Sequence, residues 1–221
     1  MGRASRRIGP PPRHDGGQEE EQTMTDELAT FVDRYTMRHE RTYPHPIERV
    51  WEAVTTAEHL DAWMLPVCQV EARLGGSWSF TFADPDGVAM EGVIVEFDPP
   101  RVVDYGGMRF ELETVTGGTR LVFVQSFPPG FRQDQSIVPV GDPGGDLPAG
   151  PDTPWRPGFV AGFHGMLDGL GRHLDGTLEP QPYIDGVHPH HKGVYDPDWV
   201  RMCQLYRQHI RTTIPGGVSG K

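Results

Sequence analysis

Residues 155–176 read WRPGFVAGFHGMLDGLGRHLDG and carry the strongest helical pattern in the chain. Large apolar side chains recur there on one helix face over about four turns: Phe159, Phe163, Met166, Leu167, Leu170 and Leu174. Pro157 suits the first turn of a helix, because its missing N–H would have no partner there. Several glycines interrupt the stretch, although glycine costs roughly 1 kcal/mol relative to alanine inside a helix. We therefore predict a long helix that a sheet or a ligand approaches closely at its glycines.

The stretch before this helix, from Val67 to Phe127, has the period of two that is typical of β-strands. Trp78, Phe80 and Phe82 alternate with small polar residues, so they share one face of a predicted strand. Glycine and proline clusters separate the strands, and Gly117-Gly118 is typical of a tight hairpin. Consecutive hairpins indicate an antiparallel meander.

The residues upstream of the meander predict one strand and several short helices. Alternation over Thr36 to Tyr43 indicates the strand. Pro46 is well placed to begin a helix, with its apolar face formed by Ile47, Val50, Trp51 and Val54. Thr55 and Glu58 fit a capping box, which would begin a second short helix. Another amphipathic helix is predicted for Thr25 to Arg34.

The two ends of the chain differ from this middle part. Residues 1–23 have too few apolar side chains to bury a core, and we expect them to be disordered. Residues 128–154 are rich in proline, glycine and aspartate and predict a long loop. Residues 196–213 predict a helix with Asp196 as its N-cap. We expect its apolar face to pack on a partner subunit, as in a homodimer, or to cover the mouth of a cavity.

These boundaries divide the chain into a tail (1–23), one folded domain (24–176) and a C-terminal extension (177–221). The composition then excludes several classes of function. Lys and Arg number 20 and Asp and Glu 31, and the net charge of −11 repels nucleic acid and anionic membranes. No apolar run approaches the roughly 18 residues that a membrane span needs.

Cysteine usage and the absence of familiar motifs narrow the function further. Cys68 and Cys203 are too few for a disulfide framework, so we expect free thiols in a cytoplasmic protein. The sequence has no phosphate-binding loop, dinucleotide fingerprint or nucleophile elbow. We therefore expect no cofactor.

A series of local motifs, in this order along the chain, resembles one known family. Residues 41–51 read RTYPHPIERVW, residues 55–63 read TTAEHLDAW, and residues 97–101 read FDPPR. Shorter matches are GGSW at 75–78, EGVI at 91–94, GTRL at 118–121 and LDGLGRHLDG at 167–176. Together they resemble the START-like (SRPBCC) superfamily, most of all the branch named for the activator of heat-shock-protein ATPase. The resemblance covers residues 36–127 and 155–176.

This resemblance implies an α+β helix-grip fold, in which a curved antiparallel sheet wraps around a long C-terminal helix. The helix predicted for 196–213 would be an addition to that fold. The resemblance also implies an apolar cavity between sheet and helix, in which superfamily members bind hydrophobic molecules and some catalyse cyclisation or hydrolysis. It supplies no shared set of catalytic residues, and function does not follow from a fold alone.

Candidate ligand-binding residues are the aromatic and methionine side chains on the predicted inner faces, because ligand pockets are mostly apolar with a few polar groups. They are Trp63, Met64, Phe80, Phe82, Met90, Tyr105, Phe110, Phe123, Phe159, Phe163 and Met166, with Arg41 as a polar contact. Arg41 and His39 share one face of the first strand, so either can meet a ligand carboxylate or phenol.

Two further sets of polar residues are candidates for chemistry. His164 and Asp168 lie four residues apart on the predicted long helix, where they can touch and act as an acid–base pair. His188, His190 and His191 invite a metal site, but a proline-broken loop rarely presents three imidazoles to one ion. We assign no catalytic or metal role to either set.

We therefore predict a protein that binds a hydrophobic small molecule in a cavity of about 300 Å³ or more between sheet and helix, without catalysis. One alternative is a cyclase, dehydratase or hydrolase that uses the same cavity, with His164 or His39 as its base. The other is a protein-binding module akin to the co-chaperone.

Overall fold

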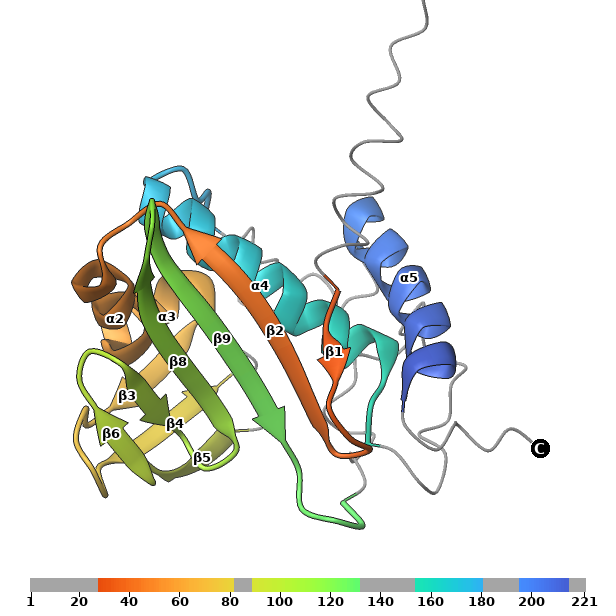
Figure 1. The fold of residues 1–221 in the computed structure, drawn as a ribbon, viewed down its shortest axis with the longest axis horizontal. Coiled ribbons are helices and arrows are strands. Elements are labelled where there is room, and N and C mark those ends of the chain that lie inside the picture. Colours follow the sequence, from red (N-terminus) through yellow and green to blue (C-terminus); the bar gives the residue numbers. More distant parts are fainter. Residues whose placement is uncertain (1–27, 82–88, 132–153, 181–194, 215–221) are drawn as a thin grey trace, which may run out of the picture.

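The computed structural model describes residues 28–81, 89–131, 154–180 and 195–214 (Figure 1). A six-stranded antiparallel sheet dominates the fold, in the order β1-β2-β9-β8-β7-β6. Its strands are β1 (Thr30–Phe31), β2 (Thr36–Tyr43), β6 (Glu96–Asp98), β7 (Val102–Asp104), β8 (Met108–Val115) and β9 (Gly118–Ser126). A smaller sheet has the order β3-β4-β5. Its strands are β3 (Val67–Val70), β4 (Ser77–Thr81) and β5 (Ala89–Val93).

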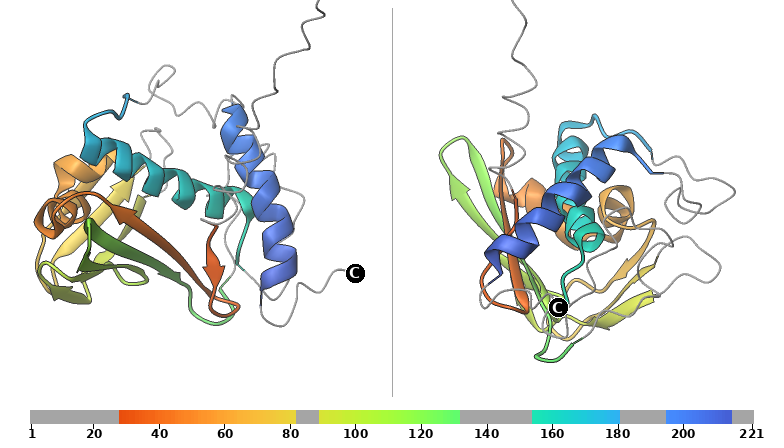
Figure 2. Two further views of the ribbon diagram at one scale, coloured as in Figure 1. Left: turned by 45° about the horizontal axis from the view of Figure 1, so that its top comes forward. Right: turned by 90° about the vertical axis from the view of Figure 1, so that its right-hand side faces the viewer.

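The helices cover one face of the large sheet. They are α2 (Ile47–Thr55), α3 (Ala57–Trp63), α4 (Pro157–Asp175) and α5 (Pro197–Thr213). Figure 2 shows α4 lying along the sheet and α5 crossing the N-terminal end of α4. The fold is therefore the helix grip, an α+β arrangement with a curved antiparallel sheet around the long helix and one extra C-terminal helix. None of the helices described here is long and apolar enough to cross a membrane.

Strand β2 is the element that brings the sheet and α4 together. It pairs with β9 along its whole length, from Thr36 opposite Ser126 to Tyr43 opposite Thr119. The predicted strand and the observed strand have the same bounds. At its end the Tyr43 hydroxyl donates to the Leu167 carbonyl of α4 over 2.9 Å, which fastens the helix to the edge of the sheet.

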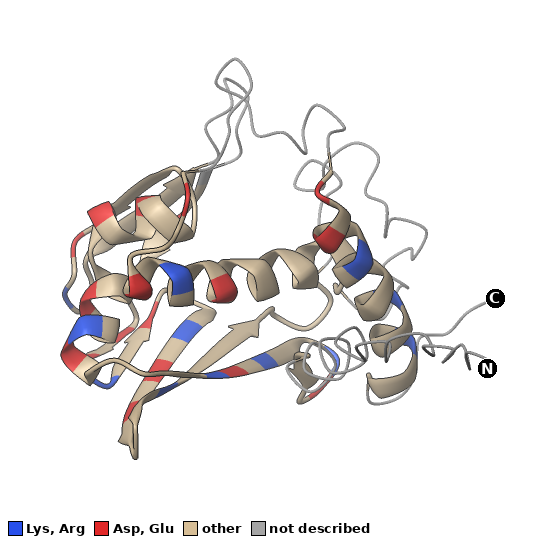
Figure 3. Ribbon diagram, turned by 90° about the horizontal axis from the view of Figure 1, so that it is seen from above, with Lys and Arg blue, Asp and Glu red and all other residues tan. Residues whose placement is uncertain are grey.

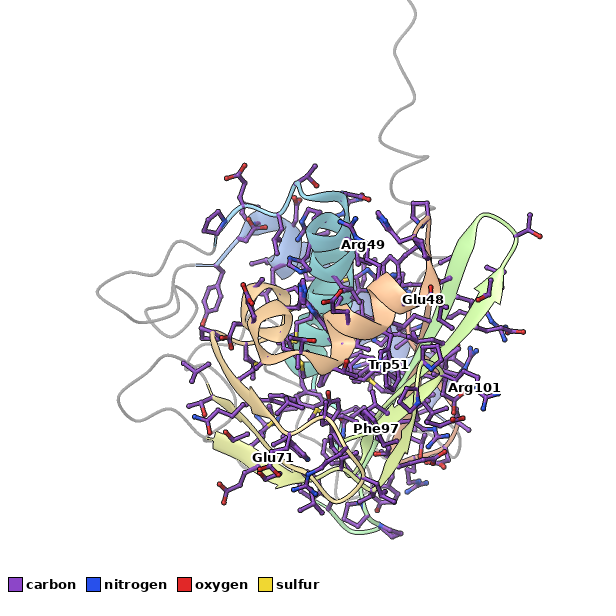
Figure 4. All side chains as sticks on the ribbon, turned by 90° about the vertical axis from the view of Figure 1, so that its left-hand side faces the viewer. Glu48, Arg49, Trp51, Glu71, Phe97 and Arg101 are labelled. Atoms are coloured by element: carbon purple, nitrogen blue, oxygen red, sulfur yellow. The ribbon has the colours of Figure 1, made fainter. Side chains whose placement is uncertain are left out.

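Packing of α2 against the far part of the sheet also agrees with the sequence. The rings of Trp51 on α2 and Phe97 on β6 have centroids 5.4 Å apart, and Figure 4 shows the two side chains next to each other. The expected capping box is wrong, because the N-cap of α3 is Thr56 and no side chain caps it. The Thr55 hydroxyl instead donates to the Trp51 carbonyl within α2.

The helix expected over residues 25–34 is also wrong, as far as the structure describes it. Thr30 and Phe31 form β1, which pairs with Arg38 and Met37 of β2. Phe31 is buried and its ring lies 5.7 Å from that of Trp155. The apolar residues have helical spacing, but they form a two-residue strand. Pairing with β2 and burial of one aromatic ring outweigh the weak local preference for a helix.

The predicted α5 forms, with Asp196 accepting hydrogen bonds from the backbone N–H groups of Asp198 and Trp199. The apolar face of α5 is covered by the same chain and not by a partner subunit. Met202, Cys203, Tyr206 and Ile210 are buried, and α5 packs against α4 of the same chain. This face therefore gives no reason to expect a homodimer, which stays a prediction without support from α5.

The glycines of α4 play a smaller part in close packing than the sequence suggests. A methyl group added at Gly171 would lie 3.3 Å from the ring of Tyr43, so this glycine permits the close approach of β2. At Gly162 and Gly165 the same methyl group would meet open space. Charged residues on α4 occur only in its C-terminal half, as the view from above shows (Figure 3).

We predict that Gly165→Ala stabilises the protein by about 0.5–1 kcal/mol, because alanine loses less backbone entropy in a helix interior. Gly171→Ala serves as the matched control and should gain less, since its methyl group presses on Tyr43. Urea unfolding of both variants measures the difference. An equal gain from both would contradict the packing of Tyr43 on α4.

Candidate functional site

An aromatic crevice lies between the large sheet, α3 and α4. Seven side chains line it: Trp63, Met64, Phe110, Phe123, Phe163, Met166 and Leu167. The ring of Phe123 is 5.0 Å from that of Phe110 and 4.8 Å from that of Phe163, centroid to centroid. The crevice encloses about 180 Å³ of empty space but is too narrow to admit a water molecule.

The expected cavity of about 300 Å³ or more is therefore wrong at this place. The physical reason is that the aromatic rings of β8, β9 and α4 stack across the gap and fill it. Six of the predicted lining residues do meet around the crevice, and Leu167 joins them. A ligand can enter only if side chains move, and two of the lining residues are methionines, whose flexible side chains repack readily.

The remaining predicted lining residues lie elsewhere. Phe80 and Tyr105 form a second aromatic group with Trp78, with ring centroids 4.7–5.8 Å apart. Phe159 packs beside Phe163 with centroids 5.0 Å apart, and Met90 is partly buried against the core. Phe82 lies outside the described residues.

A group of buried basic side chains occupies the neighbouring part of the sheet. Alternation along β2 turns Met37, His39, Arg41 and Tyr43 inward, and all four are buried. His39 is 1% exposed and Arg41 is 8% exposed. Buried charges and imidazoles are expensive unless other polar groups satisfy them. The helices α4 and α5 supply those groups for Arg41 and for His164, but not for His39.

The resulting buried basic cluster consists of His39, Arg41, His164, Asp168 and Tyr206. His164 Nδ1 lies 3.0 Å from the Tyr206 hydroxyl, and His164 Nε2 lies 3.2 Å from Arg41 Nη2. Asp168 Oδ1 lies 3.4 Å from Arg41 Nη2, and Asp168 Oδ2 lies 3.5 Å from His164 Nε2. The sequence-predicted His164–Asp168 pair is therefore in contact, and Arg41 reaches both partners.

The protonation of the cluster follows from burial and from these contacts. The Ala29 N–H donates to the Tyr206 oxygen over 2.9 Å, which leaves the hydroxyl hydrogen free to point at His164 Nδ1. Burial lowers the pKa of His164 to about 4, against the opposing effect of Asp168 and with a further lowering by Arg41. Burial raises the pKa of Tyr206. Both rings are thus neutral at pH 7, and neither is a ready nucleophile.

His39 is the unusual member of the cluster. Burial lowers its pKa well below the ordinary value, with Arg41 and His164 adding to the effect. Neither ring nitrogen has a hydrogen-bond partner among the residues that the structure describes. Its ring lies 5.8 Å from that of His164 and 6.4 Å from that of Phe123. An unsatisfied buried polar group costs roughly 1–3 kcal/mol. A ligand that forms a hydrogen bond with His39 would remove this cost.

Sequence reasoning missed Tyr206 as a member of this cluster. Tyr206 lies at helical spacing from Cys203 and Ile210 on α5, but this spacing does not say which element the shared face covers. His209, one turn further, accompanies it with a ring 6.1 Å from that of Tyr206. The metal candidates His188, His190 and His191 lie outside the described residues.

The comparisons with known proteins agree with this fold. Residues 44–141 match the family of Activator of Hsp90 ATPase homolog 1-like proteins. The match spans less than half of the chain, and together with the helix-grip fold it supports a START-like protein in the branch of those homologues. No curated protein matches the chain in sequence.

Of the three solved structures named here, only the first superposes well enough to support the fold, and it supports nothing beyond the fold. A conserved protein of unknown function from Enterococcus faecalis superposes with a TM-score of 0.55 at 16% identity, over 86% of this chain and 97% of that one. CalU16 from Micromonospora echinospora has a TM-score of 0.46 at 16% identity, over 79% and 84% of the two chains. A protein from Nitrosomonas europaea has a TM-score of 0.46 at 18% identity, over 65% and 96%.

The neutral state of His164 predicts how stability depends on pH. Its pKa falls from 6.5 in an ordinary imidazole to about 4 in the fold. Between these values the unfolded chain binds more protons, so the free energy of unfolding should decrease as the pH is lowered from 7 to 4. The full contribution of this residue is on the order of 3 kcal/mol.

Urea unfolding at a series of pH values measures this effect in the wild type and in His164→Gln, whose side chain does not titrate. We expect a shallower pH dependence in the variant, which retains only what His39 and the other groups contribute. Identical slopes in the two proteins between pH 4 and 6.5 would mean that His164 does not change its pKa on folding.

Proposed function

We propose that this protein binds a small hydrophobic molecule between the large sheet and α4, without chemical conversion of that molecule. The aromatic crevice carries the proposal. Its walls come from the sheet, α3 and α4, and they consist of apolar side chains of the kind that line ligand pockets. Entry of the ligand displaces Met64 and Met166, which lie at the α3 and α4 walls of the crevice.

His39 supports a ligand with one hydrogen-bonding group. Phe123 lies next to both the crevice and His39, because its ring centroid is 4.8 Å from that of Phe163 in the crevice and 6.4 Å from that of His39 on the neighbouring strand. A neutral imidazole offers one donor and one acceptor. A hydroxyl or carbonyl group on the ligand would satisfy the ring that has no partner among the described residues.

The charge of the site favours a neutral ligand. Arg41 and Asp168 balance each other within the cluster, and the histidine rings are neutral at pH 7. A carboxylate ligand would bring an unbalanced charge into this buried site, which is expensive.

We further propose that the protein is cytoplasmic. Cys68 and Cys203 are both free thiols, and thiols stay reduced in that compartment.

We predict that N-phenyl-1-naphthylamine, a neutral apolar dye that fluoresces in apolar surroundings, binds the full-length protein saturably at one site. Met166→Trp fills the crevice and should weaken binding about tenfold or more, which corresponds to about 1.4 kcal/mol. The matched control Val32→Trp adds the same ring at a position that is 58% exposed, and should leave binding unchanged.

Fluorescence titration measures all three affinities, and circular dichroism confirms that the variants fold. Absence of saturable binding to the wild type would contradict the proposal. Equal affinities for wild type and Met166→Trp would place the dye outside the crevice and would equally contradict it.

A further inference from the structure

A pair of histidines that the proposed function does not use lies at the junction of α3 and α4. His59 Nδ1 and His173 Nε2 are 2.7 Å apart, and the ring centroids are 5.0 Å apart with the rings nearly perpendicular. The two residues are 114 positions apart in the sequence and come from two helices that pack on each other. His59 is about one-third exposed, so the pair is reachable from solvent.

We propose that His59 and His173 bind a divalent late transition metal, with zinc as the representative ion. Imidazole nitrogen is a preferred ligand of zinc, nickel and copper. The two facing nitrogens are 2.7 Å apart, and the metal takes the place of the single hydrogen that lies between them. Water molecules complete the coordination sphere, as they do at zinc sites that keep open positions.

The distance between the nitrogens is compatible with this assignment. Zinc–nitrogen bonds of 2.0–2.1 Å at a tetrahedral angle place two ligand nitrogens about 3.3 Å apart. The rings must therefore separate by about 0.6 Å from their hydrogen-bonded positions, a change within reach of small rotations of two side chains.

The proton balance is also satisfied. A neutral imidazole carries one hydrogen, which can reside on either nitrogen. On metal binding His59 carries it on Nε2, which lies 4.0 Å from Glu52 Oε1, and His173 carries it on Nδ1. At 4.0 Å the Glu52 carboxylate is too far away for a hydrogen bond, so it favours this tautomer by its charge alone. No proton needs to leave a neutral pair.

Metal ligation requires the neutral imidazole, so binding is tested above pH 7. The Arg49 guanidinium donates to the Leu174 carbonyl oxygen at the end of α4.

Within the described residues no group of three or more His, Cys, Asp or Glu side chains is placed to hold a metal ion. The proposed site therefore has two protein ligands and Glu52 outside them, and its affinity is that of a reversible site. Bound metal would link α3 to α4. These helices carry Trp63, Met64, Phe163 and Met166 of the aromatic crevice, so the link would stiffen the crevice walls.

Isothermal titration of the full-length protein with zinc chloride at pH 7.5 tests the proposal. His188, His190 and His191 are replaced by alanine in every protein, because that histidine-rich segment could bind zinc by itself. On this background His59→Ala and His173→Ala should each weaken binding at least about tenfold, since even the loss of a partner outside the ligand set has that effect. His45→Ala is the matched control, because His45 pairs with Asp175 and not with this pair.

The expected result is binding of one zinc ion that is lost in the first two variants and kept in the control. Thermal melts without metal check folding, and His173→Gln replaces His173→Ala if the alanine variant unfolds. Three outcomes would overturn the proposal: no zinc binding on the background protein, unchanged binding in His59→Ala and His173→Ala, or equal loss in the His45→Ala control.

Discussion

The burial of two basic side chains on the inner face of β2 is the constraint on which the rest of the structure depends. Period-two alternation directs both His39 and Arg41 into the space beneath α4. A strand with only apolar residues at these positions would need no polar side chains from neighbouring elements. With His39 and Arg41 in place, the core needs polar partners for them, because unpaired buried polar groups are costly.

The two C-terminal helices meet this need for Arg41, whereas His39 has no hydrogen-bond partner among the described residues. From α4, His164 and Asp168 reach Arg41. From α5, the Tyr206 hydroxyl holds His164 and also accepts the backbone N–H of Ala29, which ties the start of the described chain to its end. The extra helix is thus part of the core of this domain. A polar network that is completed by three separate elements favours one arrangement of those elements over others.

The inner face of the sheet therefore has two regions, the aromatic crevice and the buried basic cluster. The side of α4 that faces α3 is apolar and closes the aromatic crevice, whereas His164 and Asp168 of α4 meet Arg41 and Tyr206. The ring of Phe123 lies next to both regions. The proposed ligand therefore meets apolar walls first and a single uncharged polar group beyond them, a combination typical of small-molecule sites.

Local pattern was enough to predict much of this structure. The alternation of β2, the apolar face of α4 and the Asp196 cap of α5 are consequences of neighbouring residues, and the structure confirms all three. The His164–Asp168 contact was predictable for the same reason, since residues four apart on a helix are neighbours.

Contacts that join distant parts of the chain were not predictable in this way. Tyr206 meets His164 across 42 residues and Ala29 across 177. His59 meets His173 across 114 residues. The width of the crevice depends on how aromatic rings from β8, β9 and α4 stack, and spacing along each element says nothing about the distance between elements. The strand β1 was missed because pairing with β2 overrides a weak helical pattern.

The central claim is that a neutral His39, which has no hydrogen-bond partner among the described residues, lies beside a site for a small hydrophobic molecule. Nitrogen-15 NMR of the imidazole rings tests it most directly, with 1-naphthol as a ligand that carries one hydroxyl group and naphthalene as its counterpart without one. The account predicts a neutral His39 ring at pH 7, whose nitrogen shifts change on addition of 1-naphthol and change little with naphthalene. A protonated His39, or a spectrum in which its nitrogens do not respond to either molecule, would contradict the account.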